Sequence, residues 1–239
     1  MGNHEYNAIC FHTLHPETNE PLREHSEKNI DQHESFLMEF NHRPHKHVEI
    51  ISWFKTLPLF LDLGFARIVH AEWDQDLIDS IMIIKEEGQP HSDEFFYQSA
   101  LEGSHLCNVI ETLLKGSEIT LPEGITFKDK DGHSRDKGRI KWWESDGRLD
   151  NIFMVPDQTK KQLSGMDKNR INHTPYKAEY PPVFFGHYWL KGNPRVLSEN
   201  AVCVDYSVGK EGGKLCCYSY MVDQKLDDGN FCFIERMEG

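Results

Sequence analysis

Apolar residues recur at helical spacing along the first half of the chain, three or four positions apart. This periodicity predicts helices over residues 26–40, 48–55, 75–85 and 92–114, and a short helical piece followed by a loop over residues 6–25. Ser26, Asp74 and Ser92 precede three of these helices as capping residues, and Gly116 ends the last. The first half is therefore expected to be mainly helical.

Short apolar runs bounded by turn residues predict strands. They cover residues 59–63, 65–69, 182–185, 201–204, 215–221 and 231–234. The run at 65–69 is followed by His70, and the run at 182–185 by Gly186 and His187. We expect these two strands to lie in one sheet. Ligands gather outside strand ends in sheets covered by helices, so the two histidines are candidate binding residues.

Residues 86–180 differ in character from the segments on either side. Residues 129–147 are charged and rich in glycine, and residues 156–180 show little periodicity and are expected to be loop. We interpret residues 86–180 as an insertion that covers the site and selects the substrate. The expected architecture is a single α/β (α+β) domain over residues 1–239, with two mixed β-sheets flanked by helices.

Composition limits the classes of partner. The 239 residues are 38% hydrophobic and 27% charged, and the formal net charge is −13. A nucleic-acid-coating protein needs a basic face, so we expect no nucleic-acid partner. We expect no membrane partner either, because no apolar run has the length to cross a bilayer, and no secretion signal follows Met1. The oligomeric state stays open.

The cysteines indicate a reducing compartment. No C-x-x-C pair occurs among them, and Cys216 and Cys217 are adjacent in an apolar run, where neighbouring side chains of a strand face opposite ways. The six are Cys10, Cys107, Cys203, Cys216, Cys217 and Cys232. We expect all of them to be reduced and mostly buried in a cytoplasmic protein.

The stretch Gly2-Asn3-His4-Glu5 carries candidate chemistry. An asparagine carbonyl oxygen is a neutral, hard ligand for a divalent metal, and the adjacent histidine can pass a proton to a leaving oxygen. A turn near a terminus explains the four residues alone equally well. Together with His70 and His187, however, Asn3 makes a plausible set of three ligands for one divalent ion.

These motifs resemble those of the calcineurin-like metallophosphoesterases. Gly-Asn-His-Glu at 2–5 resembles the third family motif, and Val69-His70 and Gly186-His187 match the next two in order. Val-Asp-Tyr-Ser at 204–207, Gly-Gly-Lys-Leu at 212–215 and Leu-Leu-Lys-Gly-Ser-Glu at 113–118 are similar to the branch of bacterial Ser/Thr phosphatases and bis(5'-nucleosyl)-tetraphosphatases. The matches extend from residue 2 to about residue 217.

The resemblance implies a mechanism. Asn3, His70 and His187 would bind the second metal of a two-metal centre, and His4 would be the acid that protonates the leaving oxygen. Metal hydroxide would attack phosphorus in line. The metal is expected to be Mn²⁺, with Fe, Zn or Ni as alternatives. The substrate would be a nucleoside polyphosphate or a phosphoprotein.

The two earlier family motifs, an Asp-x-His and a Gly-Asp-x-x-Asp-Arg-Gly, do not precede Gly2. We therefore expect an N-terminally truncated member whose first strands are missing, holding one metal instead of two. Asp131-Gly132-His133 also spells Asp-x-His, but it follows charged residues and is interpreted as a turn. The alternative function is a non-catalytic remnant that binds metal or phosphate, and a third is a histidine-rich metal store.

Further cationic and histidine clusters remain open to two interpretations. Arg135 and Arg139 alternate with lysines ahead of Trp142-Trp143. They could bind the substrate, with the cations on a phosphate chain and an indole against a nucleobase. We favour the alternative, in which they form the solvated face of a strand. His42, His45 and His47 could form a metal site, but a solvated loop leading into a helix is favoured, because few carboxylates lie near to orient them.

Overall fold

The computed structural model describes residues 1–40, 42–82, 91–129, 132–145, 147–171 and 173–237. Contacts divide the chain into two compact units. The first comprises Met1–Leu61 and Asp74–Lys115, and the second comprises Asp62–Trp73 and Gly116–Gly239. The division at Lys115 falls inside the expected insertion, so residues 86–180 contribute to both units. The single domain with an insertion stays a prediction.

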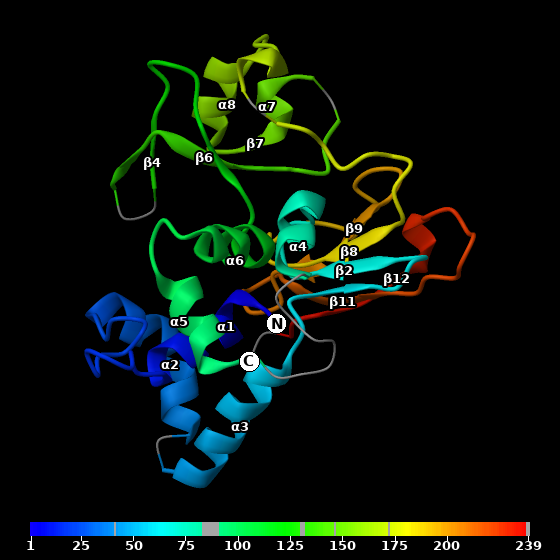
Figure 1. The fold of residues 1–239 in the computed structure, drawn as a ribbon. Coiled ribbons are helices and arrows are strands. Elements are labelled where there is room, and N and C mark those ends of the chain that lie inside the picture. The colour runs from blue at the N-terminus through cyan, green and yellow to red at the C-terminus, as the bar shows by residue number, and fades with distance from the viewer. Residues whose placement is uncertain (41, 83–90, 130–131, 146, 172, 238–239) are drawn as a thin grey trace. The chain divides into compact units, whose positions relative to one another are not determined.

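Helices build the first unit (Figure 1). They are α1 (Asn3–His12), α2 (Glu27–Phe40), α3 (Pro44–Thr56), α4 (Gln75–Met82), α5 (Asp93–Ala100) and α6 (His105–Lys115). Helix α1 packs against α3 and α5, and α6 packs against α4 and α5. Ile9, Phe96, Val109 and Leu113 are buried in this core. Within the described ranges, no helix combines the length and apolar character needed to cross a bilayer.

Helix caps confirm two predicted starts and explain one error. Asp74 Oδ1 accepts a hydrogen bond from Leu77 N at 3.0 Å, and Ser92 Oγ accepts one from Phe95 N at 3.1 Å. The single helix predicted over residues 92–114 is wrong. The chain turns at Gly103, where φ is +79°, and Ser104 Oγ accepts from Cys107 N to start α6.

A cluster of aromatic and histidine rings joins α1, α2 and α3. His12 Nε2 lies 3.1 Å from His33 Nε2, and the ring centroids of His12 and His47 are 4.1 Å apart. His33 also stacks on Phe36. The solvated loop predicted at His42, His45 and His47 is wrong for the last two, because α3 begins at Pro44. The helix carries His47 into the cluster, while His45 is exposed.

Short strands and small helices build the second unit. The strands are β1 (Phe60–Asp62), at the division between the units, β2 (Arg67–Val69), β3 (Glu118–Thr120), β4 (Phe127–Lys128), β5 (Ser134–Arg135), β6 (Lys137–Ile140), β7 (Phe153–Met154), β8 (Val183–Phe185), β9 (Ala201–Cys203), β10 (Asp205–Tyr206), β11 (Lys214–Tyr218) and β12 (Phe231–Glu235). The helices are α7 (Leu149–Ile152), α8 (Asp157–Leu163), η1 (Lys168–Arg170) and η2 (Asp228–Asn230). The predicted loop over residues 156–180 is therefore wrong at α8.

The largest sheet confirms the expected pairing of the two strands that end in histidines. Its order is β1-β2-β8-β9, and β2 pairs with β8 in parallel, with Arg67 opposite Val183 and Ile68 opposite Phe184. These strands lie side by side in Figure 1. The other sheets have the orders β10-β11-β12, β3-β6-β7 and β4-β5. The predicted mixture of helices and sheets, α+β, is confirmed.

The strands predicted over residues 201–204 and 215–221 lie in different sheets. Strand β9 continues the parallel sheet beside β8, and the antiparallel partner of β11 is β10. Cys203 and Asp205 thus belong to different sheets. The short step between them carries the chain from one sheet to the next.

Trp142 anchors the core of the second unit. Its side chain is 2% exposed, and its indole Nε1 donates a hydrogen bond to Ala71 O at 3.0 Å. The centroid of its ring lies 4.8 Å from that of Phe185 in β8. Trp143 is also buried and contacts the same phenylalanine. Both indoles therefore attach the segment after β6 to the β1-β2-β8-β9 sheet, which we call the central sheet.

We expect Trp142→Phe to lower the free energy of unfolding by about 1–3 kcal/mol, since it leaves Ala71 O without its donor and opens a void. Urea denaturation followed by circular dichroism measures the change. Trp189→Phe, at a side chain 44% exposed, is the matched control and is expected to cost less than about 1 kcal/mol. Equal losses in the two variants would contradict the anchoring role.

The histidine cluster predicts acid lability of the first unit. Burial lowers the pKa of His12 and of His33 to about 4, and the neighbouring His4, His25, His47 and Arg23 act in the same direction. Unfolded histidine has a pKa of about 6.5, so the unfolded chain binds more protons between pH 6.5 and pH 4. The stability contributed by the neutral rings is complete above that window and is lost as pH falls through it.

Because both rings are only half buried, we expect a loss on the order of 1 kcal/mol for each histidine. Urea denaturation at a series of pH values measures it. His33→Gln should flatten the dependence on pH, whereas His45→Gln, at an exposed position of α3, should leave it unchanged. An unaltered pH profile in His33→Gln would refute this account.

Candidate functional site

Parallel pairing of β2 and β8 places two histidines at the same edge of the central sheet. His70 follows the last residue of β2, and Gly186 and His187 follow β8. The two ring centroids are 5.2 Å apart, and Gly186 N donates to His70 O at 2.9 Å. The carboxyl edge of a parallel sheet is where ligands bind in such folds. These two rings are therefore the centre of the candidate site.

His187 lies in an unusual backbone conformation. Its φ is +68° and that of Trp189 is +50°, in the left-handed region that costs a residue with a side chain about 1–2 kcal/mol. Asp205 holds this turn: its Oδ2 accepts from Trp189 N at 3.3 Å, and its backbone oxygen accepts from Leu190 N. The neighbouring sheet thus fixes the direction of the His187 turn.

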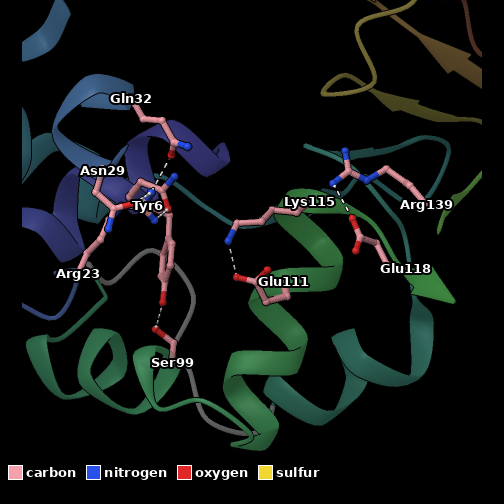
Figure 2. Close-up of polar contacts among 10 residues, drawn as sticks. Tyr6, Arg23, Asn29, Gln32, Ser99, Glu111, Lys115, Glu118 and Arg139 are labelled. Atoms are coloured by element: carbon pink, nitrogen blue, oxygen red, sulfur yellow. Dashed lines mark hydrogen bonds and ion pairs between the residues drawn. The ribbon is translucent and has the colours of Figure 1, made fainter. Parts of the chain in front are cut away.

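Arg139 of β6 reaches the histidine pair. Its Nη1 lies 3.2 Å from His187 Nε2, and its Nη2 donates to Glu118 Oε1 at 3.5 Å, the latter pair being visible in Figure 2. A guanidinium only donates, so His187 Nε2 must accept. Arg139 Nε is buried and has no hydrogen-bond partner among the described residues. Within the described part of the chain, one donor of Arg139 is thus buried without an acceptor.

The two predicted substrate-binding arginines have different surroundings. Arg135 forms an ion pair with Asp129, in which its Nε donates to Oδ2 at 2.8 Å, and about half of its side chain is exposed. Arg139, in contrast, is one-third exposed and contacts a predicted metal ligand. Of the pair, Arg139 alone is placed by these contacts at the candidate site.

Tyr188 is a buried neighbour that the sequence patterns did not identify. Its side chain is 5% exposed, and its hydroxyl has no hydrogen-bond partner in the described part of the chain. Burial raises its pKa well above the usual value, and the negative charge of Glu72 adds to the shift. A Cβ at residue 116 would lie 2.4 Å from Tyr188 Oη, so that position requires glycine. The sequence feature that could have identified Tyr188 is its position directly after the predicted ligand His187.

Asn3 and His4 belong to the first unit, where they begin α1. Gly2 N donates to Glu5 Oε2 at 2.8 Å, which closes the first turn of the helix. The sequence Gly2-Asn3-His4-Glu5 is therefore a helix start. The expected helical piece over residues 6–25 begins earlier than predicted, at Asn3.

His4 lines a small polar pocket within the first unit. The pocket is also formed by Asn7, Phe11, Arg23, Asn29, Gln32 and His33. Arg23 donates to Asn29 Oδ1 and to Gln32 Oε1, both at 2.8 Å (Figure 2). The exposed side chain of His4 thus faces amide groups and a guanidinium of its own unit.

The histidine pair supplies some, but not all, of the ligands that a metal or anion site needs. Neutral imidazoles are common ligands of divalent transition metals. Among the residues that the structure describes, however, no group of three or more His, Cys, Asp or Glu side chains is arranged to hold an ion. A metal on His187 Nε2 would also have to displace the Arg139 guanidinium. The turn expected at Asp131-Gly132-His133 is observed at Gly132, where φ is +83°, while Asp131 lies outside the described residues.

No protein-family model, curated protein or solved structure matches this chain. The function is therefore inferred from the residues and contacts of the chain itself. The observation that joins most of them is the contact between His70, His187 and Arg139.

We expect neutral His187 to carry its proton on Nδ1, because Nε2 accepts from Arg139. Two-bond ¹H–¹⁵N correlation spectra of histidine rings distinguish the tautomers. Arg139→Leu should shift His187 toward the Nε2–H form. Arg135→Leu is the matched control, since its ion pair is with Asp129, and it should leave the spectrum of His187 unchanged. A predominant Nε2–H form in the unsubstituted protein would disprove the contact.

Proposed function

We propose that this chain is a metal-dependent phosphoester hydrolase of the calcineurin-like type, acting on a nucleoside polyphosphate or a phosphoprotein. The observation that supports this most is the meeting of His70 and His187 after two parallel strands, 5.2 Å apart between ring centroids. A pair of strand-end histidines from distant parts of the sequence is what the resemblance implies. The sandwich of two mixed sheets belongs to the proposal.

His70 and His187 would hold a divalent ion, expected to be Mn²⁺. Asn3 as a further ligand stays a prediction of the resemblance. The ion would supply the Lewis acidity and the activated water that phosphoester hydrolysis needs. The backbone of the His187 turn is already fixed by Asp205, so its imidazole loses little freedom on binding. The role of His4 as the acid for the leaving oxygen likewise stays a prediction of the resemblance.

Arg139 would bind a phosphoryl oxygen of the substrate. Its Nε has no hydrogen-bond partner among the described residues, and a metal on His187 Nε2 would release Nη1 as well. Arginine suits phosphate because its planar fork donates two parallel hydrogen bonds. The free state of the six cysteines suits a reducing compartment such as the cytoplasm.

A second candidate function is a phosphate-binding module without turnover. The specific observation in its favour is that Arg139 donates to His187 Nε2, which occupies the lone pair a metal would use. In this alternative the imidazole orients the guanidinium and the guanidinium binds the anion. The two candidates differ in whether Mn²⁺ binds the histidine pair.

Equilibrium dialysis with Mn²⁺ separates the two candidates. We expect the hydrolase to bind Mn²⁺, and His70→Gln or His187→Gln to weaken binding by about 10–100-fold, because each removes a ligand. Arg139→Leu should strengthen binding by freeing Nε2. His133→Gln is the control, at an exposed histidine of the β4–β5 turn. If the double variant His70→Gln/His187→Gln still binds Mn²⁺, the assigned ligands are contradicted.

Hydrolysis of para-nitrophenyl phosphate tests turnover. Hydrolysis by the proposed enzyme should require Mn²⁺, because the bound ion would supply the activated water. Activity should fall in His4→Ala, which removes the acid that the resemblance implies. Phosphate binding without Mn²⁺-dependent turnover would contradict the hydrolase and favour the module.

A further inference from the structure

Two thiols face each other across adjacent strands at the end of the second unit. In the antiparallel pair of β11 and β12, Cys217 lies directly opposite Cys232. Both are free and exposed. This differs from the expectation that the cysteines are mostly buried, which holds for Cys10 and Cys203 but fails for this pair.

The hydrogen bonds at the two ends of the ladder define the spacing of the cysteine pair. Ser219 N donates to Asn230 O, and Arg236 N donates to Gly213 O. Hydrogen-bonded pairs alternate along an antiparallel ladder, so Cys217 and Cys232 form such a pair, with Cα atoms about 5.5 Å apart. Disulfides span Cα separations of about 4.4–6.8 Å. The register therefore permits a bond between these two sulfurs.

The surroundings leave this pair accessible. Leu215 and Ile234 flank the cysteines on the same face of the sheet and are 61% and 71% exposed. Strand β12 is at the edge of its sheet, with β11 as its neighbour. An edge strand can shift more easily than a central one, and opposed Cβ atoms, about 4.5–5.5 Å apart, must approach to about 3.5–4.5 Å.

Cys216 provides an internal contrast. It faces the other side of the sheet, opposite Phe233 in the register. Its thiol lies 3.8 Å from Lys214 O, and burial raises its pKa. A higher pKa means less of the reactive thiolate. The adjacent thiol in the sequence is thus neither opposed to another thiol nor as accessible.

We propose that Cys217 and Cys232 are a redox modification site that forms a reversible cross-strand disulfide with low-molecular-weight disulfides. One cysteine thiolate attacks a sulfur of glutathione disulfide, forms a mixed disulfide and releases one glutathione. The second cysteine, losing its proton, attacks the protein sulfur of that mixed disulfide and releases the second glutathione. Two protein thiols are oxidised, one glutathione disulfide is reduced to two thiols, and the two protons end on glutathione.

Reversibility follows from the geometry. The bond must draw the two strands together at a hydrogen-bonded pair, and strained, exposed disulfides are the ones most readily reduced. The oxidised form ties the edge strand β12 covalently to β11, which in turn pairs with β10. Oxidation therefore converts a ladder held by hydrogen bonds into a crosslinked one.

Trypsin separates the two cysteines cleanly, because it cuts after Lys214, Lys225 and Arg236. The reduced full chain is treated with glutathione disulfide, alkylated and digested, and the peptides are analysed by mass spectrometry without reduction. We expect residues 215–225 linked to residues 226–236, at least about tenfold above the singly glutathionylated peptides, because the second attack is intramolecular. Cys107, on α6, should give only the mixed disulfide.

Three variants and one condition make the result decisive. Cys216→Ser should retain the link, while Cys217→Ser and Cys232→Ser should replace it with one glutathione on the remaining thiol. Each of three outcomes would overturn the proposal: a link through Cys216, a covalent dimer as the main product, or equally rapid linking in concentrated urea, where the strand register is lost.

Discussion

The parallel pairing of β2 with β8 is the constraint on which the candidate site depends. It joins Arg67 to Val183 and thereby sets His70 and His187 at one edge of the sheet. Trp142 reinforces the pairing from one side, because its indole bonds to the residue after His70 and its ring packs on Phe185. Asp205 reinforces it from the next sheet by holding the turn that carries His187. The two imidazoles therefore meet because the β2–β8 pairing, Trp142 and Asp205 all fix the strand ends that carry them.

The sequence predicted the parts of this arrangement that depend on local pattern. Apolar runs followed by His70 and His187 identify both strands and their polar ends, since strand patterns and turn glycines are local signals. Asp74 and Ser92 mark helix starts for the same reason. The pairing itself was inferred from the likeness of the two strand ends, and the structure confirms it.

What the sequence did not reveal depends on tertiary contacts or on weak periodicity. The break between α5 and α6 lies within a continuous helical period, where Gly103 and Ser104 give little signal. Helix α8 is short and charged and buries few side chains, so it reads as loop. The contacts of Arg139 with His187 and of His12 with His33 join residues from different elements. The spacing of these residues along the chain does not predict such contacts.

The β2–β8 ladder also bears on the rate of folding. The helices of the first unit form from contacts between near neighbours in the sequence, whereas Arg67 cannot meet Val183 until the long intervening chain has closed into a loop. Non-local strand pairs form slowly because this entropy is lost before their contacts are gained. The histidine pair should therefore assemble late, after most helical structure is present. In slow-folding variants of this protein, helical signal would then precede the contact between the rings of His70 and His187.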